Sequence, residues 1–579
     1  WSIVAVCVLI SSVSIADPLV IPPDTHLRLN GEIADPVECY GILSPTEGDA
    51  IWLDGQVSVF EGGVVELGDH NGGLYLNALD SVIHGGGRLM ANVAYVGHEA
   101  EGSLHLMDGG RLTADSLLSC GYHAPGSIVM DGGWLWASSA RIGHLDEGRF
   151  EQHGGVVSAP FSMTVGDLGV GYYTMTGGQL QTRSLTLQTG GSEFVLQDGA
   201  VSVVRDLTFE EGGRVRIDGA LLEIHGGSFE AWDMFVTSSG SEDATVNQWG
   251  GRLNVETALG LGGDNRNTDY RLFDGEVTAN RLTMSGGFYY SAWHMEGGGA
   301  SFADGGRMGL ADTIQRTIFA VSGGELTAGD FAVGDRYIGT VTLDGGRSHV
   351  GYFQAPQYSK VYFGEHDMVV DDSMHVSGLF DVTDAGPKSI EARGILDFGH
   401  ATLQRHGAGI EMTVGPESLL ILPAGVPLSR LGTVTGDPLV AHTGAPVVVP
   451  AGRRVTGRGR LEGAFDCRGA LQASAGHGLD MTGSIVLGDG GVIDLVGEGL
   501  GQFDQDDIIF GQGRLLITGT ASRIDGGLLN ARHIGVGRDG VGRIVQNGGE
   551  VCGASMTLAR SDAGDGVYEM HDGTLDLQG

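Results

Sequence analysis

The sequence has little positive charge and no long apolar run. Its 33 Lys and Arg residues face 72 Asp and Glu residues, which gives a formal net charge of −39. A chain with this charge repels phosphate backbones and anionic membrane surfaces, so we expect no nucleic-acid partner. No segment stays apolar over the ~20 residues that a membrane-spanning helix needs.

Cysteine is also rare, with five among 579 residues. Cys7 lies in the apolar N-terminal run, and the other four, at positions 39, 120, 467 and 552, are far apart and form no Cys-x-x-Cys pair. A structural zinc site needs clustered ligands, so the sequence does not support one. Cys120 falls where other repeats have Val or Ile, which indicates a small buried apolar side chain.

The repeat region lacks the 3.6-residue apolar period of a packed helix. What recurs instead is a glycine pair followed by a short apolar stretch. Five successive pairs have spacings of 23, 23, 22 and 23 residues: Gly86-Gly87, Gly109-Gly110, Gly132-Gly133, Gly154-Gly155 and Gly177-Gly178. A fixed period of this size is typical of a repeat architecture.

Each repeat contains three short apolar or alternating runs separated by Gly, Asp, Pro and Ser, which predicts three strands and three corners. No single repeat buries its apolar face alone, so stability would come from stacked neighbours. We therefore predict an all-β fold, a right-handed parallel β-helix (β-solenoid), with about three short strands per coil of about 20–25 residues. Roughly 20–25 coils at ~4.8 Å each predict a length of about 100–120 Å.

The repeats align into three apolar columns that we expect to form the core. The first holds Leu89, Leu112, Leu135, Val157 and Leu180, the second Val96, Cys120, Ile142, Val165 and Leu187, and the third Ile128, Phe150, Tyr173 and Phe194, with His105 in the same place one coil earlier. Side chains alternate along a strand, so Trp134 and Trp136 on either side of Leu135 should point outward.

The pattern changes later in the chain. Gly457-Arg458-Gly459-Arg460-Leu461-Glu462-Gly463 forms a Gly-x-Gly-x-Leu-x-Gly run, and Phe503-Asp504 follows it after a turn in which Ala473-Ser474-Ala475-Gly476 replaces a Pro-Gly form. With the glycine-pair coils, this run resembles the repeats of autotransporter passengers and of PEP-CTERM-sorted exported proteins of Gram-negative bacteria. The resemblance implies a secreted or surface-displayed β-solenoid, and no catalytic residues come with it.

The N-terminus predicts a secretory signal, because an apolar run at 3–10 precedes Ser14-Ile15-Ala16, whose small residues suit cleavage after Ala16. We expect a C-terminal region outside this sequence to attach the protein to the outer membrane or cell surface. The predicted segments are a partial signal peptide at 1–16, an N-terminal cap at 17–58, the β-solenoid repeat array at 59–349, irregular coils at 350–425, a passenger-like β-strand segment at 426–520 and resumed repeats at 521–579.

Parallel β-helices include pectin-degrading enzymes, and three fragments match motifs of that class: Asn267-Thr268-Asp269, Asp371-Asp372 and Gly476-His477-Gly478. They lie about 100 residues apart, which predicts a separation of four to five coils, or about 20 Å. Acid–base work on one glycosidic bond needs carboxylates within about 5–10 Å. We therefore expect no catalytic residues.

Three other groups are candidate binding residues. Asp264, Asn267 and Asp269 offer hard oxygen ligands to calcium, although an Asn/Asp-rich turn is the favoured interpretation. The outward Trp134 and Trp136 are candidates for stacking on sugar rings, against the alternative of a plain surface ladder. A basic stripe is expected to pair with nearby carboxylates rather than to bind a polyanion: Arg453, Arg454, Arg458 and Arg460.

The sequence thus favours a secreted or cell-surface, structural, adhesin-like β-solenoid without catalytic activity or cofactor. The alternative is a carbohydrate-binding or polysaccharide-degrading β-helix protein, such as a lyase or glycoside hydrolase. Surface glycans or self-association are the expected partners, because repeats present similar side chains at regular intervals and so favour many weak contacts.

Overall fold

The computed structural model describes residues 6–7, 18–29, 31–33, 35–45, 51–54, 56–68, 73–189, 191–203, 214–218, 220–238, 243–262, 266–285, 289–308, 316–333, 339–383, 386–498, 513–537, 540–559 and 564–578. Apart from Val6 and Cys7, the predicted signal peptide lies outside these ranges, as does Asp264. Strands make up 65% of the chain, and the predicted β-solenoid is confirmed, with about 22 turns spaced about 22 residues apart. Within the described ranges, no helix is long and apolar enough to span a membrane.

A single coil illustrates how the sequence forms three strands. Strands β18 (Val156–Ala159), β19 (Ser162–Val165) and β20 (Gly171–Met175) each bury every second residue. Each pairs in parallel with its counterpart in the next coil. Gly155, the second glycine of its pair, has a φ of 73°, which glycine reaches at little steric cost.

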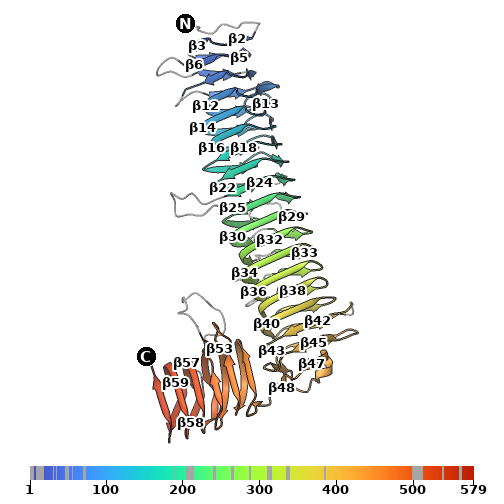
Figure 1. The fold of residues 1–579 in the computed structure, drawn as a ribbon, viewed down its shortest axis with the longest axis vertical. Coiled ribbons are helices and arrows are strands. Elements are labelled where there is room, and N and C mark those ends of the chain that lie inside the picture. Colours follow the sequence, from blue (N-terminus) through green and yellow to red (C-terminus); the bar gives the residue numbers. More distant parts are fainter. Residues whose placement is uncertain are drawn as a thin grey trace. The chain divides into compact units, whose positions relative to one another are not determined.

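The chain divides into two compact units, Trp1–Ala303 with Gly309–Phe319 and Asp304–Met308 with Ala320–Gly579. Two strands contribute residues to both units, β34 (Gly299–Met308) and β35 (Arg316–Val321). The remaining strands of unit 1, coloured blue to green in Figure 1, are β1 Val6–Cys7, β2 Leu19–Ile21, β3 His26–Leu29, β4 Gly31–Ile33, β5 Val37–Cys39, β6 Ile42–Pro45, β7 Ile51–Asp54, β8 Val57–Val59, β9 Val64–Glu66, β10 Gly73–Leu76, β11 Ser81–Ile83, β12 Arg88–Val96, β13 Gly102–Leu106, β14 Arg111–Cys120, β15 Gly126–Met130, β16 Trp134–Ile142, β17 Gly148–Gln152, β21 Gln179–Thr182, β22 Ser184–Gln188, β23 Glu193–Leu196, β24 Ala200–Val203, β25 Arg214–Asp218, β26 Leu221–Ile224, β27 Ser228–Ala231, β28 Asp233–Thr237, β29 Ala244–Gln248, β30 Arg252–Leu261, β31 Thr268–Leu272, β32 Glu276–Met284 and β33 Tyr290–Met295.

Strand pairing confirms the first two predicted columns. Leu112 pairs with Leu89 on one side and Leu135 on the other, and Cys120 lies between Val96 and Ile142. All six side chains are buried. The inward columns therefore form a continuous apolar core, as expected for stacked coils.

The third column is confirmed with one correction. Ile128 pairs with Leu104, whereas His105 pairs with Val129. His105 was expected in the column, but strict alternation along β13 buries Leu104 and points His105 outward, 2.6 Å from Asp131 Oδ2. Further along the column, aromatic rings stack at 4.8 Å between centroids: Phe150 on Tyr173, and Tyr173 on Phe194.

The segment 17–58 was expected to cap the array, yet it forms coils of its own. Strand β2 pairs in parallel with β5, and β5 with β8. Strand β3 pairs in the same way with β6, and β6 with β9. Short alternating strands stack here although the glycine pair is missing, so the described part of this segment belongs to the repeat stack.

Unit 2 begins with coils that continue the same three-strand pattern through the predicted irregular region 350–425. Its first stack consists of β36 Glu325–Val333, β37 Gly339–Leu343, β38 Arg347–Ala355, β39 Lys360–Phe363, β40 Asp367–Val376, β41 Leu379–Val382, β42 Ser389–Ala392, β43 Ile395–Asp397, β44 Thr402–Arg405, β45 Ile410–Val414, β46 Leu419–Leu422, a 3₁₀ turn η1 at Leu428–Arg430, β47 Gly432–Gly436 and β48 Leu439–His442. Strands β47 and β48 still pair with β45 and β46, so this stack extends to His442 rather than ending at 425.

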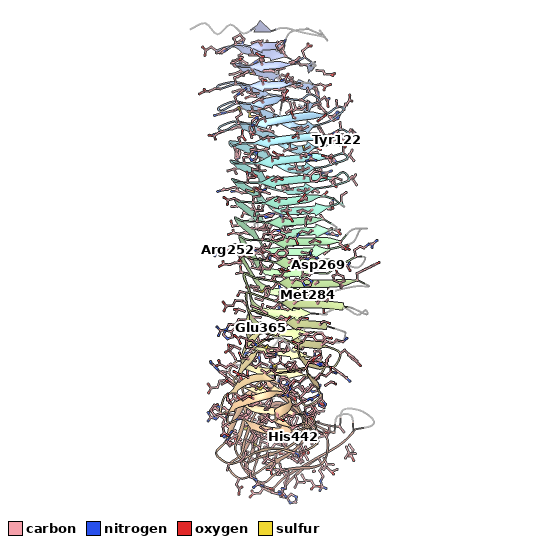
Figure 2. All side chains as sticks on the ribbon, turned by 90° about the vertical axis from the view of Figure 1, so that its right-hand side faces the viewer. Tyr122, Arg252, Asp269, Met284, Glu365 and His442 are labelled. Atoms are coloured by element: carbon pink, nitrogen blue, oxygen red, sulfur yellow. The ribbon has the colours of Figure 1, made fainter. Side chains whose placement is uncertain are left out.

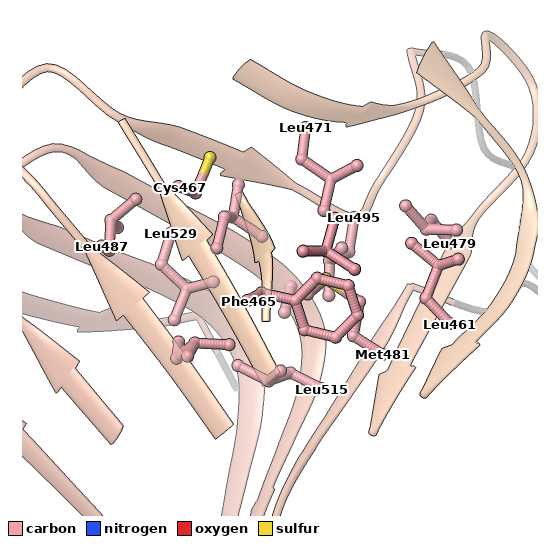
Figure 3. Close-up of a cluster of buried hydrophobic side chains, with 14 of the residues drawn as sticks. Leu461, Phe465, Cys467, Leu471, Leu479, Met481, Leu487, Leu495, Leu515 and Leu529 are labelled. Atoms are coloured by element: carbon pink, nitrogen blue, oxygen red, sulfur yellow. The ribbon is translucent and has the colours of Figure 1, made fainter. Parts of the chain in front are cut away.

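A separate sheet of 13 strands begins at Val447. It joins the passenger-like segment and the resumed repeats in one stack, so the expected boundary at 520 does not divide the fold. Its strands are β49 Val447–Val449, β50 Arg454–Gly457, β51 Gly459–Cys467, β52 Ala470–Ala473, β53 Leu479–Leu487, β54 Val492–Asp494, β55 Arg514–Ile517, β56 Gly519–Ile524, β57 Leu528–Val536, β58 Val541–Gln546, β59 Glu550–Leu558, β60 Asp565–Met570 and β61 Thr574–Leu577. Leu461, Phe465 and Met481 belong to its apolar core (Figure 3).

Candidate functional site

Aromatic rings line one outward face of unit 1. Tyr75 in β10 pairs in register with Tyr95 in β12, and their rings stack with centroids 5.3 Å apart. The ring of Trp52 in β7, one coil earlier, lies 5.3 Å from that of Tyr75. Because parallel coils superpose equivalent outward residues at ~4.8 Å, these rings form a continuous surface.

The corner that follows continues this surface, with one ring in each of three coils. His98 stacks on Tyr122 at 5.4 Å, and Tyr122 meets the ring of His144 edge-on at 4.9 Å. Each ring follows a glycine with positive φ, such as Gly121 at 73°, where a Cβ atom would overlap the Glu147 carbonyl of the next coil. Tyr122 lies at the edge of the stacked strands in Figure 2. We call this set the aromatic ladder: Trp52, Tyr75, Tyr95, His98, Tyr122 and His144.

A hollow of about 370 Å³ opens at the N-terminal end of the ladder. Three ladder rings and three carboxylates line it: Trp52, Tyr75, His98, Glu32, Asp54 and Glu99. In the part of the chain that the structure describes, no Lys, Arg or His nitrogen lies within ion-pair distance of these three carboxylates. The hollow therefore combines apolar ring faces with negative charge that no described residue neutralises.

Asn77 holds two walls of the hollow in place. Its amide nitrogen donates a hydrogen bond to Asp54 Oδ1 at 2.6 Å. Its amide oxygen accepts the backbone N–H groups of His98 at 3.1 Å and Glu99 at 2.7 Å. One side chain thus fixes a carboxylate of β7 and the corner after β12, which are two coils apart.

Gly73 leaves room for the Trp52 ring. Strand pairing places Gly73 of β10 directly beside Trp52 of β7, in the preceding coil. A Cβ atom at Gly73 would overlap the Trp52 ring. Its φ is not in the left-handed region, so the position needs glycine for space rather than for backbone conformation. Such a close approach of backbone to a ring is one of the ordinary uses of glycine.

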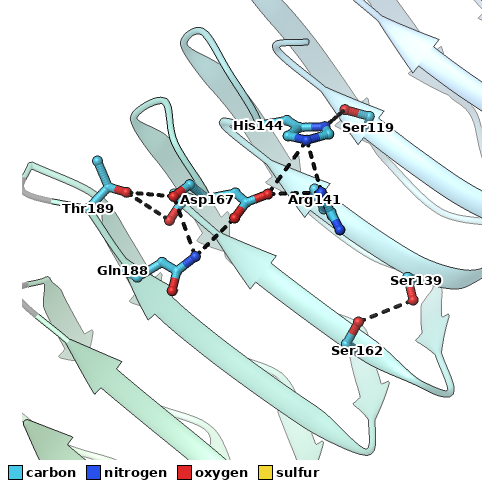
Figure 4. A network of polar contacts seen from close by, with 9 residues as sticks. Ser119, Ser139, Arg141, His144, Ser162, Asp167, Gln188 and Thr189 are labelled. Atoms are coloured by element: carbon cyan, nitrogen blue, oxygen red, sulfur yellow. Dashed lines mark hydrogen bonds and ion pairs between the residues drawn. The ribbon is translucent and has the colours of Figure 1, made fainter.

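The far end of the ladder differs, because its charges are paired within the protein (Figure 4). Arg141 Nη1 lies 3.0 Å from Asp167 Oδ2 and 2.9 Å from His144 Nε2. Gln188 donates to Asp167 Oδ1 at 3.1 Å, and His144 Nδ1 bonds to the Ser119 hydroxyl at 3.0 Å. The ladder therefore runs from a hollow with free carboxylates to a neutralised polar network.

Burial and neighbouring groups shift the pKa values along the ladder. Partial burial, and then the nearby Tyr95, Tyr122 and Asp54, raises the pKa of Tyr75. Burial lowers the pKa of His98, although the Glu99 carboxylate opposes that shift. Both side chains are thus mainly neutral at pH 7, and neither adds charge to the hollow.

The sequence-predicted tryptophans point outward as expected but lie away from the hollow. Trp134 is 39% exposed and Trp136 is half-buried, with Leu135 inward between them. Trp134 is flanked in its column by Arg111 and Val156, so no aromatic ring stacks above or below it. This pair is a local apolar patch rather than a rung of the ladder.

The described members of the predicted calcium site bond to other protein groups and do not converge on one position for an ion. Asp269 Oδ2 lies 3.0 Å from Arg271 Nη2, and Asn267 donates to Asp243 at 3.2 Å while its side-chain oxygen faces the Tyr290 N–H. Asp269, labelled in Figure 2, is only 8% exposed. Among the described residues, no group of three or more His, Cys, Asp or Glu side chains has the arrangement of a metal site.

Arg458 pairs with carboxylates, as expected for the basic stripe. Its side chain is 7% exposed, with Nη2 bonded to Asp330 Oδ1 and Nε 3.0 Å from Asp372 Oδ2. Its guanidinium lies 4.6 Å from the Tyr352 ring, and Nη1 donates to His477 Nδ1 at 2.9 Å. Of the other stripe residues, Arg453 pairs with Asp437 and Arg460 with Glu462.

This cluster corrects the sequence argument about spacing. Asp372 and His477 belong to two of the enzyme-like fragments and were expected about 20 Å apart, yet both contact the Arg458 guanidinium. Counting coils failed because β50 packs against β40 and β43 instead of lying further along one stack. Arg458 neutralises Asp372, and Ser474 donates to its other oxygen at 2.5 Å, so both carboxylate oxygens are occupied.

The Gly-x-Gly run explains how the junction of β50 and β51 lies so close to β40 and β43. A Cβ atom at Gly457 would overlap Ile395, and one at Gly459 would overlap His375. Gly459 also has a φ of 103°, a conformation that side chains rarely adopt. The motif thus places Arg458 between the two stacks of unit 2, where its backbone N–H donates to Ser373 Oγ at 3.0 Å.

No protein-family model, no curated protein and no solved structure matches this chain. The arrangement of side chains alone therefore indicates what the surface can do. Outward, half-buried rings at the spacing of the coils can stack on the apolar faces of a repeating ligand. The Arg458 cluster connects parts of unit 2.

Proposed function

We propose that this chain is a secreted or cell-surface, structural, adhesin-like β-solenoid without catalytic activity, and that it attaches to surface glycans. The observation that carries the proposal is the aromatic ladder, in which outward rings follow one another over consecutive coils from Trp52 to His144. A repeated surface of this kind favours many weak contacts, and their avidity supplies the affinity.

The resemblance to exported repeat proteins of Gram-negative bacteria supports the location. It rests on the glycine-pair coils and on Gly457-Arg458-Gly459 with its following Leu461 and Gly463. A formal net charge of −39 suits a long surface that stays soluble outside the cell. We propose that the protein is attached to the outer membrane or cell surface.

Glycan binding by the purified chain tests this function directly. The chain, immobilised on beads to supply avidity, should bind a panel of surface polysaccharides or whole cells. The double variant Tyr75→Ala/Tyr122→Ala should lose at least about tenfold in bead retention, because each stacked ring contributes roughly 1 kcal/mol. Circular dichroism and an unchanged unfolding midpoint would show that its fold is intact.

The variant Trp134→Ala/Trp136→Ala is the matched comparison, since it removes two outward rings that do not belong to the ladder. We expect it to weaken binding less than the ladder variant. If both variants bind as the parent does, the aromatic surfaces are not the attachment site. Turnover of a polysaccharide by the pure protein, abolished by one carboxylate substitution, would instead identify the protein as a polysaccharide lyase or glycoside hydrolase.

A further inference from the structure

The hollow at the N-terminal end of the ladder has a charge that the rest of the ladder lacks. Glu32, Asp54 and Glu99 contribute three carboxylates around the rings of Trp52 and Tyr75. At the other end, Arg141 neutralises Asp167 within the protein. The hollow therefore favours a ligand with its own positive charge over a neutral or negative one, since such a charge offsets the three carboxylates.

We propose that this hollow binds the protonated amine of an amino sugar within a cationic glycan. The ammonium would lie among the three carboxylates, and the apolar face of the sugar ring would rest on Trp52 and Tyr75. This inference rests on the proposed function, in that it takes the ladder to be a glycan-binding surface and names the class of glycan.

Two attractions act together on such a ligand. The faces of tryptophan and tyrosine rings carry negative potential and attract a cation that lies over them. Carboxylates gathered around a concave site attract it further, and more strongly than they would on a flat surface. A neutral sugar gains only the stacking contribution, so the hollow discriminates by charge.

The hollow is also held in shape before any ligand arrives. Asn77 fixes Asp54 and the backbone at His98 and Glu99 through three hydrogen bonds of 2.6, 3.1 and 2.7 Å. Gly73 lets the Trp52 ring lie close against the neighbouring coil. Few side chains of the hollow therefore become ordered when a ligand binds, which lowers the entropic cost of binding.

The size of the hollow suits a short stretch of polymer. Its volume of about 370 Å³ is at the lower end of the range for small-molecule sites, roughly 300–1,000 Å³. The ring of Tyr95 stacks on Tyr75, and the ring of Tyr122, 4.9 Å further on and tilted by 57°, continues the surface along the coils. One amino sugar occupies the hollow, and the following sugars extend along the ladder.

Two oligosaccharides with the same backbone separate charge from stacking. Chitosan hexamer carries free amines, and chitin hexamer carries the same sugars with the amines acetylated. Isothermal titration of the full chain at pH 6 and low salt should give at least about tenfold tighter binding for chitosan hexamer. Raising the ionic strength to about 0.5 M should remove most of that difference. Hexalysine, which has charge without sugar, should bind more weakly than chitosan hexamer.

Variants test the residues of the hollow one feature at a time. Asp54→Asn/Glu99→Gln should weaken chitosan binding about tenfold and leave chitin binding unchanged. The new amide at position 54 keeps an oxygen that accepts the hydrogen bond from Asn77, so the shape of the hollow is retained. Glu230→Gln, which removes one exposed carboxylate of β27 outside the lining of the hollow, is a charge control and should bind as the parent does. Gly73→Ala should weaken both ligands by displacing the Trp52 ring, with the unfolding midpoint showing that the coils persist.

The outcomes distinguish this inference from the proposed function. Equal binding of both hexamers, or unchanged chitosan binding by Asp54→Asn/Glu99→Gln, overturns the amine site while leaving glycan binding in place. Tighter binding of hexalysine than of chitosan identifies a site for cationic peptides instead and also overturns the inference. Loss of binding to every glycan on the panel would overturn the proposed function itself.

Discussion

The phenol of Tyr173 donates a hydrogen bond to Gln152 Oε1 in the preceding coil, at 2.6 Å, inside the apolar core. Both side chains are fully buried. The Gln152 amide nitrogen in turn donates to the Gln179 carbonyl at 3.0 Å, so the polar pair is satisfied without water. The same relationship recurs between Tyr270 and Gln248 at 2.5 Å.

Replacing Gln152 by leucine should destabilise the protein, because the buried phenol of Tyr173 loses its acceptor. We expect the free energy of unfolding to fall by roughly 1–3 kcal/mol in denaturant titrations. The double variant Gln152→Leu/Tyr173→Phe should recover part of that loss, since the core then holds no phenol without an acceptor. Equal losses in the single and double variants would contradict the pairing.

The core columns predict a sharp contrast between inward and outward positions. Val165 is fully buried between Ile142 and Leu187, so Val165→Asp should cost several kcal/mol by placing an unpaired carboxylate in the core. Arg111 lies on the outer face of β14, and Arg111→Ser should change stability by no more than about 0.5 kcal/mol. Similar denaturant midpoints for the two variants would show that the strand register is wrong.

Removing the buried Arg458 guanidinium should destabilise unit 2, because two carboxylates lose their cation. Asp372 is 13% exposed and Asp330 is 31% exposed, so Arg458→Met should cost about 2–3 kcal/mol, less than breaking a fully buried pair. Arg460→Met, which removes an exposed partner of Glu462, should cost no more than about 1 kcal/mol. Denaturant unfolding followed by far-UV circular dichroism measures both losses. An unchanged free energy of unfolding in Arg458→Met would contradict a stabilising role of the Arg458 cluster.

Stability should fall below pH 6.5, in part because of His366. Burial lowers the pKa of this side chain from 6.5, while its Nδ1–H donates to the Gly345 carbonyl at 2.6 Å and Nε2 faces the Ser348 hydroxyl at 2.8 Å. Between the folded-state pKa and 6.5 the unfolded chain binds more protons, so the free energy of unfolding rises with pH. The stabilising effect is complete above pH 6.5 and is lost as the pH falls from there through the folded-state pKa.

Denaturant midpoints measured from pH 7.5 down to about 5 check this behaviour, and His366→Gln should flatten the profile. Burial also lowers the pKa of His477 beside Arg458 and of His144 in the ladder, so part of the slope should remain in that variant. A midpoint that rose on acidification would contradict the assignment.

The repeat architecture was readable from the sequence because stacking repeats one pattern in every coil. Leu89, Leu112 and Leu135 follow the glycine pair at a fixed distance, and that regularity is enough to place them in one column. His105 was misplaced by one residue, since a one-residue error in a strand exchanges the inward and outward faces.

The candidate site was much harder to predict. The sequence does carry a signal for the rings at the corner. In three successive coils the residue of the second apolar column is followed by a glycine and then by His or Tyr: Val96-Gly97-His98, Cys120-Gly121-Tyr122 and Ile142-Gly143-His144. The hollow carries no such signal, because Glu32, Asp54 and Glu99 come from different coils and take different places in them. Only the folded stack brings them together.

Arg458 and Asp330 are 128 residues apart in the chain, whereas neighbouring coils are about 22 residues apart. Stacked coils form from near neighbours, so they can nucleate at several places and grow by short steps. The contact between Arg458 and Asp330 requires a much longer loop to close and should therefore form late, after the coils on either side exist. An interaction made after the folding transition state chiefly slows unfolding. The Arg458 cluster would thus determine how long the folded protein survives rather than how fast it forms.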